Sequence, residues 1–439
     1  MPQRYWIVGI AAVAALWMYI DRVCISILAD PMQVDLGLSD QAKENALGAF
    51  FLTYALFQIP VGTLADRYGP RLILSLSIAA WSVVTACTGL VGSFVALYAV
   101  RLLLGVTEAG AYPAAAALVK RWALPTERGK FSAIVALGGR IGGAFAPTLT
   151  AALAIAFAGS QLIPAANPSG VNWRGVFVLY GTLGVTIAIL FWSVVRDHPP
   201  HVPKVSRDDR EDGTTKLANP LKTDRSTHTE QNAVFIVRLW RLATSRNMWL
   251  FGLLQFCNNI SWAFLITLLP TYLKDAQVDL ELRSTIQTGV LLAGCVGMLY
   301  GGFVTDYARN RLGLRWGRSA PIALTMTICA LMCGVVSSSP GLWLAVGALA
   351  IMAFCQDLGI PAVWAFAQDV GGRNVGAALG WGNMLGNLGA AISPRLLGEV
   401  KRAGGWEAAF ALCAGCYVIA VLSGLLMDAS KPVEPDQED

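Results

Sequence analysis

Four charged residues lie inside long apolar runs of this chain, where their types and spacing could support anion binding and proton exchange. Asp21 and Arg22 are adjacent in the run 7–28, and Arg101 and Glu108 lie seven residues apart in a later run. A buried ion is costly unless it is paired or faces water. Arginine stays charged and can hold a carboxylate through two hydrogen bonds, whereas aspartate and glutamate can carry a proton. The four residues predict an aqueous pathway through a helical bundle.

Helical geometry gives these residues separate roles. Neighbouring residues point about 100° apart around a helix, so one of Asp21 and Arg22 can line a cavity while the other reaches a neighbouring helix. A spacing of seven returns Arg101 and Glu108 to nearly the same face, about 10 Å apart along the axis. We expect Glu108 to stay ionised when it pairs with Arg101 and to take up a proton when a substrate claims an arginine. A purely structural ion-pair network is the alternative interpretation.

The charges of these four residues sum to zero, and a bound carboxylate would add one negative charge. A proton on Asp21 or Glu108 would restore neutrality, which is the simplest reason to couple an anion to a proton. We expect Glu108 to be the main proton carrier and Asp21 to couple protonation to substrate binding.

The composition indicates an integral membrane protein. Hydrophobic residues make up 55% of the chain and charged residues 14%, against about 25% charged residues in soluble domains. Apolar stretches of about 20 residues, enough to cross about 30 Å of hydrocarbon as a helix, recur along the chain. The predicted fold is all-α, with twelve transmembrane helices in two pseudo-symmetric six-helix bundles. The expected spans are 6–29, 45–65, 71–91, 94–118, 130–157, 174–195, 248–271, 285–305, 318–338, 341–367, 375–399 and 406–427.

The cysteines and histidines offer neither a disulfide framework nor a metal site. Nine cysteines stand singly in apolar runs, and the three histidines all lie in the polar middle of the chain. We expect no cofactor and no metal. We also expect no covalent catalysis, because no soluble segment gathers a nucleophile and a base.

The positions of lysine and arginine between the spans predict the orientation. The connections after even-numbered spans carry most of them, including Arg67, Lys120 and Arg128, whereas the first odd-numbered connection is acidic. Both termini are therefore expected in the cytoplasm, with the protein a monomer in the cell inner membrane. The net charge of +5 reflects this topology, and no nucleic-acid surface is expected.

One long polar segment divides the chain. Residues 196–246 are rich in proline, threonine and charge, a composition that cannot bury a core. The expected parts are an N-terminal bundle (1–195), a cytoplasmic linker (196–246), a C-terminal bundle (247–430) and a cytoplasmic tail (431–439).

The two halves also share sequence patterns. Asp66 in GTLADRYGPR recurs 240 residues later as Asp306 in GGFVTDYARNR, and Pro147 matches Pro394 at an offset of 247. Paired halves around a central site are typical of alternating-access carriers.

The segment 62–71, GTLADRYGPR, resembles the signature loop of the Major Facilitator Superfamily, GxLaDrxGxr, and the resemblance extends over all the spans and the linker. Asp66 in this loop can accept hydrogen bonds from helix N-terminal amides and from nearby arginines. Such contacts would form a latch on the inner surface that must break when the halves rock. The expected latch residues are Gly62, Asp66, Arg67, Gly69, Arg71 and Arg128.

Two more segments, YIDRVCIS (19–26) and RLLLGVTEAGAYPAA (101–115), are similar to the anion:cation symporter family. That family includes bacterial sugar-acid permeases and the vesicular sialic acid and glutamate carriers. The resemblance implies these roles: Arg22 grips the substrate carboxylate, Asp21 is its protonatable neighbour, Arg101 and Glu108 are the fourth-span arginine and the proton-carrying glutamate, and Tyr54 contacts the substrate.

Polar residues elsewhere are weaker candidates. Four asparagines in spans 7 and 11 offer neutral groups suited to substrate hydroxyls, with helix packing as the alternative. Asp357 occupies a place comparable to Glu108, and the buried Arg140 has no assigned role. The asparagines are Asn258, Asn259, Asn383 and Asn387.

Span 7 contains no arginine, whereas organophosphate exchangers of the superfamily use one there to hold a dianionic phosphate. We therefore expect a monocarboxylate with hydroxyls; hexonates, hexuronates and glucarate are implied by the resemblance. The overall prediction is a proton-coupled symporter that imports a small organic anion. The alternatives are an anion exchanger or uniporter, an aromatic-acid permease and, from another class, a membrane anion sensor.

Overall fold

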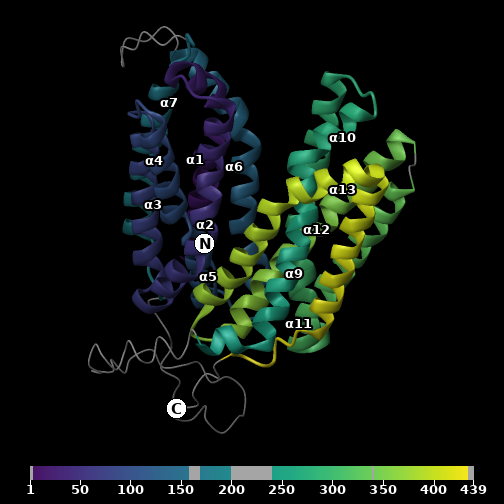
Figure 1. Ribbon diagram of the computed structural model, residues 1–439. Coiled ribbons are helices and arrows are strands. Elements are labelled where there is room, and N and C mark those ends of the chain that lie inside the picture. Colours follow the sequence, from purple (N-terminus) through teal and green to yellow (C-terminus); the bar gives the residue numbers. More distant parts are fainter. Residues whose placement is uncertain (1–2, 158–168, 199–239, 339–340, 434–439) are drawn as a thin grey trace.

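The computed structural model describes residues 3–157, 169–198, 240–338 and 341–433, and its regular elements there are all helical. In these ranges ten helices are long and apolar enough to cross a membrane, which confirms the all-α membrane fold (Figure 1). The first helices are α1 (Gln3–Leu36), α2 (Asp40–Tyr68), α3 (Pro70–Thr88), α4 (Phe94–Glu108), α5 (Ala111–Trp122), α6 (Arg128–Phe157) and α7 (Trp173–Val194). Then follow α9 (Arg246–Ala263), the π-helix η2 (Phe264–Leu268), α10 (Leu269–Asp275), α11 (Leu280–Ser337), α12 (Leu342–Val370) and α13 (Val375–Leu426).

Two of these helices are too long to be single crossings. α11 has 58 residues and α13 has 52, so they would extend about 87 Å and about 78 Å if they were straight. Gly313 (φ 74°) and Gly405 (φ 73°) interrupt them in the left-handed conformation that favours glycine. The spans expected at 285–305 and 318–338 lie on either side of Gly313. The total of twelve crossings stays a prediction.

The helices form two bundles, α1–α7 and α9–α13, which meet at one end and diverge toward the other (Figure 1). α2 packs against α13, and α6 packs against α11. The Arg196 carbonyl accepts a hydrogen bond from Trp122, which places the chain after α7 at the end where the bundles meet. We call this end the linker side. The expected linker and tail lie mostly outside the described residues, so the domain boundaries stay predictions.

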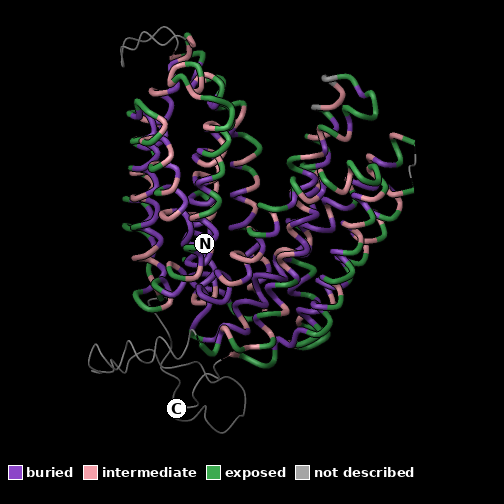
Figure 2. Tube along the Cα trace, viewed as in Figure 1, coloured by how far each residue is buried: buried purple, intermediate pink, exposed green. Residues whose placement is uncertain are grey.

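Exposed residues lie along the outer faces of both bundles (Figure 2), and many of the exposed residues are large and apolar. Such a distribution is expected of helices that face lipid instead of water. Residues that are more than half exposed include Leu76, Val95, Ile155, Ile189 and Leu324.

α1 and α6 pack backbone against backbone. A side chain on Gly138 would collide with the backbone of Ala12, and one on Gly142 with the backbone of Leu16. The two glycines are four residues apart and so lie on one face of α6. Small residues at this spacing allow membrane helices to approach closely.

We predict that Gly142→Ala destabilises the protein by about 1–3 kcal/mol, because the methyl group forces the two helices apart. The measurement is the Tm of the purified protein in detergent. Gly334→Ala in α11 is the control, since a side chain there meets no atom within 4 Å. Equal Tm values for the two variants would contradict the close contact between α1 and α6.

Candidate functional site

Arg22 of α1 and Glu108 at the end of α4 form an ion pair inside the first bundle. The Nε and Nη2 atoms of Arg22 both donate to Oε2 of Glu108, at 3.0 and 2.8 Å. The Glu108 side chain is fully buried and that of Arg22 is 13% exposed. Oε1 of Glu108 is buried and has no hydrogen-bond partner among the described residues. Arg22 is therefore held by one carboxylate oxygen and remains within reach of a further group.

A break between two helices positions Glu108. α4 ends at Glu108, and α5 begins at Ala111 with Pro113 close behind. Proline has no N–H group, so Pro113 cannot donate to the carbonyl four residues earlier, at Ala109. The regular helical hydrogen bonding is thus interrupted immediately after the acidic side chain.

Aromatic rings surround the Arg22 guanidinium. Its Cζ lies 4.3 Å from the ring centroid of Tyr54 and 5.0 Å from those of Tyr19 and Phe50. The rings of Phe50 and Tyr54 are stacked, with centroids 5.3 Å apart. Cation–π contacts of this kind orient a guanidinium without neutralising it. The sequence predicted Tyr54 but not Phe50, whose position four residues before Tyr54, on the same helix face, was the available signal.

Arg101 and Asp21 lie near this pair without sharing its hydrogen bonds. Arg101 contacts the Phe50 ring at 4.9 Å, and Asp21 is 1% exposed with no partner for either carboxylate oxygen among the described residues. The expected pairing of Glu108 with Arg101 is wrong, because Glu108 binds Arg22 instead. Arg101 is about 10 Å from Glu108 along their shared helix, whereas Arg22 approaches Glu108 directly from the neighbouring helix α1.

The candidate asparagines of the second bundle make local contacts. Asn258 is buried and its side-chain oxygen accepts from Gln356 at 3.2 Å. Asn259 donates to a backbone carbonyl one turn earlier, and Asn387 donates to that of Asn383. Asn259, Asn383 and Asn387 are partly exposed. Their role as substrate contacts stays a prediction.

Arg140, which the sequence left unassigned, pairs with Asp357 across the two bundles. Nη2 of Arg140 donates to Oδ1 of Asp357 at 2.6 Å. The Arg140 guanidinium also lies 5.1 Å from the ring centroid of Trp262. The pair joins α6 to α12 and α9.

On the linker side, Asp66 at the end of α2 connects the first bundle to the second. Its carboxylate accepts hydrogen bonds from the backbone amides of Gly376 and Ala377 at 2.8 and 2.9 Å, in the first turn of α13. Gly62, one turn earlier, packs against the backbone of Gly376. A carboxylate at a helix N-terminus is stabilised by the free N–H groups and the helix dipole. These are the amide contacts that the sequence predicted for Asp66.

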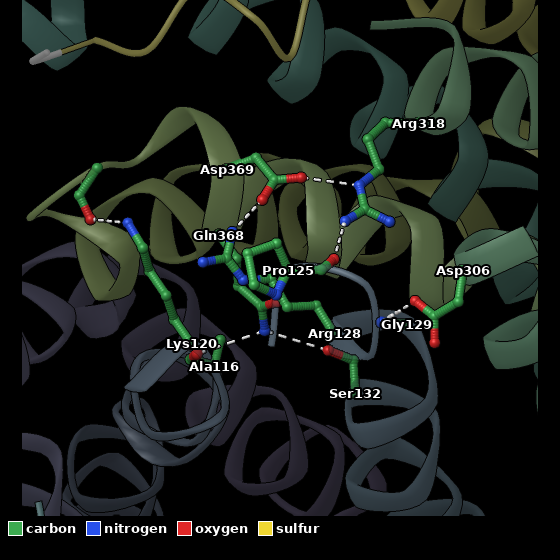
Figure 3. A network of polar contacts seen from close by, with 11 residues as sticks. Ala116, Lys120, Pro125, Arg128, Gly129, Ser132, Asp306, Arg318, Gln368 and Asp369 are labelled. Atoms are coloured by element: carbon green, nitrogen blue, oxygen red, sulfur yellow. Dashed lines mark hydrogen bonds and ion pairs between the residues drawn. The ribbon is translucent and has the colours of Figure 1, made fainter. Parts of the chain in front are cut away.

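The second half repeats this contact. Asp306 accepts from the amide of Gly129 at 2.9 Å, at the start of α6 (Figure 3), and from the amide of Lys130 at 3.0 Å. Adding 240 to 66 gives 306, and adding 247 to 129 and 130 gives 376 and 377, so both offsets found in the sequence reappear as one pair of equivalent contacts.

Ion pairs add to the contacts on the linker side (Figure 3). Arg128 and Arg318 both bind the Asp369 carboxylate, Arg318 through Nε at 2.7 Å. Arg318 also donates to the carbonyl of Pro125 in the other bundle. The expectation that Arg128 pairs with Asp66 is therefore wrong. Asp66 is already satisfied by amides, and Asp369 lies across the interface from Arg128.

The other latch residues lie around the end of α2. Arg71 donates to the carbonyl of Trp192 at 2.8 Å instead of to Asp66. Arg67 lies over the ring of Tyr68 at 5.2 Å. Gly69 has φ 95°, which a side chain would strain, and forms the turn between α2 and α3.

The profile of the Major Facilitator Superfamily matches residues 11–394 and 251–439. The chain belongs to the Major Facilitator Superfamily. The resemblance of the signature loop is thereby confirmed, and the protein is a multi-pass membrane transporter and not an enzyme.

Full-length relatives agree with this assignment. The probable sulfoacetate transporter SauU of Cupriavidus necator is 27% identical, and the match covers 100% of this chain and 97% of that protein. The probable galactarate/D-glucarate transporter GudP of Escherichia coli is 28% identical, with 97% and 93% covered. The crystal structure of the transporter FucP in the outward conformation has the same fold, with a TM-score of 0.71, 16% identity and coverage of 95% and 97%.

We predict that Asp66→Asn slows turnover more than it lowers substrate affinity, because Asp66 contacts helix amides on the linker side. It is also twelve residues, about 18 Å of helix, from Tyr54, the residue of α2 that contacts Arg22. The expected change in turnover is roughly 2- to 30-fold, the range for a charge at a helix terminus. Asp306→Asn, its counterpart, should behave alike. Uptake into liposomes and binding to purified protein separate the two quantities. A loss of affinity at unchanged turnover would contradict the latch role.

Proposed function

We propose that the protein is a proton-coupled symporter that imports a small organic anion, a sugar acid such as a hexonate, hexuronate or glucarate. The observation that carries the proposal is the buried Arg22–Glu108 pair. A fixed cation is held there by a carboxylate that can be neutralised by one proton. A substrate anion can therefore take the place of Glu108 at Arg22 while Glu108 takes up a proton.

The substrate carboxylate competes with Glu108 for Arg22. The bidentate geometry of a guanidinium suits either carboxylate. Once displaced, Glu108 would be an unpaired ion in a dry site, and taking up a proton removes that cost. The charge of the site is then the same with and without substrate, which couples the two ligands.

Arg101 and Asp21 complete this site. Arg101 shares the Phe50 ring with Arg22 and adds positive potential without competing for its partner. Asp21 is buried with no hydrogen-bond partner among the described residues, so a proton on it is gained or lost with the charge state of its neighbours. We assign Asp21 the coupling of protonation to binding and Tyr54 a direct contact with the substrate.

Alternating access follows from where the two bundles touch. The amide contacts of Asp66 and Asp306 close the linker side, and the bundles diverge on the opposite side (Figure 1). With the linker in the cytoplasm, as lysine and arginine placement predicts, this arrangement is open to the outside. The site then receives its substrate from outside the cell, across the inner membrane.

The relatives support an organic acid as substrate, since two of them are named as transporters of sulfoacetate and of galactarate or D-glucarate. An exchanger or uniporter is the second candidate, because the same ion pair could serve binding without proton coupling. An aromatic-acid permease would need the same arginine. A sensor would bind the anion without moving it.

We predict that Arg22→Ala lowers substrate affinity by at least about 100-fold, because two charge-assisted hydrogen bonds are lost. Arg22→Lys should recover only part of this, since an ammonium cannot bind a carboxylate through a planar fork. Calorimetry with a panel of sugar acids, dicarboxylates and aromatic acids measures the effect. Lys43→Ala, which removes a partly exposed cation paired with Asp30, is the control. Normal affinity in Arg22→Ala would remove the proposed site.

We predict that Glu108→Gln keeps binding and exchange but loses accumulation driven by a proton gradient, because glutamine mimics the protonated acid and cannot release its proton. Uptake of labelled anion by liposomes, with and without an inward proton gradient, tests this against the wild type. Gradient-driven accumulation by the wild type supports symport, and its absence favours the exchanger. Accumulation by Glu108→Gln would place the coupling elsewhere.

A further inference from the structure

A second ion pair lies between the bundles and away from the linker side. Arg140 is twelve residues after Arg128 in α6, and Asp357 is twelve residues before Asp369 in α12. Arg128 and Asp369 are themselves paired on the linker side. Twelve residues of helix rise about 18 Å, so the Arg140–Asp357 pair lies deep in the apolar layer.

Arg140 has bonding capacity that Asp357 does not use. A guanidinium carries five N–H donors, and the carboxylate contact of Arg140 is a single hydrogen bond from Nη2. Its side chain is 17% exposed and that of Asp357 is 8% exposed. Arg318, by contrast, is completely buried and bonded to both a carboxylate and a carbonyl. Arg140 is held in place but is still accessible.

The internal repeat does not require a cation at this position. The offset of 247 that relates α6 to α13 gives Asn387 as the counterpart of Arg140. Asn387 is neutral and donates to the carbonyl of Asn383 in its own helix. Because a neutral residue fills the equivalent position of the second half, the repeated fold does not itself require a charge at Arg140. A charged residue at this depth indicates a functional site.

One tyrosine links Arg140 to the first site. The Tyr19 ring lies 5.0 Å from the Arg22 guanidinium. The same ring packs against Gly139 and Gly143, the residues of α6 on either side of Arg140. Arg22 thus contacts the Tyr19 ring, and Arg140 lies in the segment of α6 against which the same ring packs.

We propose that Arg140 is a second anion subsite and that Asp357 occupies it while no substrate is bound. This inference rests on the proposed function and refines it: the substrate is a small organic dianion with an acidic group at each end. Arg22 binds one end and Arg140 the other, and the Trp262 ring beside Arg140 offers an apolar face to the carbon chain. The lack of arginine in span 248–271 does not limit the substrate to one charge, because α6 supplies the second cation.

Galactarate and D-galactonate are the matched probes, because they share a six-carbon polyhydroxy chain and differ in having two carboxylates or one. Wild-type protein should bind galactarate more tightly. Arg140→Gln should lower the ratio of galactarate to galactonate affinity by about tenfold or more, the loss expected for one charged hydrogen-bond partner. Asp357→Asn should raise that ratio, since it removes the carboxylate that competes for Arg140.

The two variants are expected to change the ratio of galactarate to galactonate affinity in opposite directions, which makes the test decisive. If the pair only ties the bundles together, both variants change turnover and leave the affinity ratio unchanged, which would overturn the proposal. A lower ratio in Asp357→Asn would overturn it too. Arg128→Gln is the control, since it breaks the ion pair between the same two helices on the linker side and should change turnover without changing the ratio.

A second pair of probes, sulfoacetate and acetate, separates this inference from the proposed function. Binding of the dianions, galactarate above all, with no dependence on Arg140 contradicts the dianion subsite alone and leaves the proposed function standing. If wild-type protein binds neither member of either pair, the proposed sugar-acid and organic-acid function fails, and the subsite proposal fails with it.

Discussion

A charge buried in an apolar layer of helices is costly unless it has a partner or is neutralised by a proton, and the arrangement of this transporter depends on that constraint. Glu108 holds Arg22 within the first bundle, and Asp357 holds Arg140 between the bundles. Removing one partner leaves an uncompensated ion, so such a pair opens readily only when another group takes the vacant place. The movement of the bundles is thereby tied to the presence of a suitable ligand.

The linker-side contacts and the central charges differ in their symmetry. Asp66 and Asp306 make the same amide contact in the two halves, as expected of a duplicated fold in which both halves must release together. The central cation Arg140 has no such repeat, since Asn387 takes its place in the second half. The equivalent contacts therefore belong to the part of the protein that must open and close. At the centre, where the halves differ, the site carries a positive charge on one half only.

The sequence predicts the helical fold well, because apolar runs of about twenty residues have few other solutions. It also predicts the amide contacts on the linker side. The loop that carries the aspartate occurs in both halves, and any helix N-terminus nearby offers free N–H groups to a carboxylate. The sequence does not predict the partner of Glu108. Arg101 lies on the same helix as Glu108 and is the nearer arginine in sequence. Arg22 is 86 residues away in sequence but reaches Glu108 from a neighbouring helix. The partners Arg140 and Asp357 are 217 residues apart and follow no local pattern.

The glycine contact between α1 and α6 determines how far apart the backbones that carry the two central arginines lie. Arg22 is carried by α1 and Arg140 by α6. At Gly138 and Gly142 the backbones of these two helices touch, with no side chain between them. Both arginines are therefore carried by the first bundle, on two helices whose backbones are in direct contact. A site built in this way selects its ligand by length. An acid too short to reach both cations contacts only one of them, however many hydroxyl groups it carries.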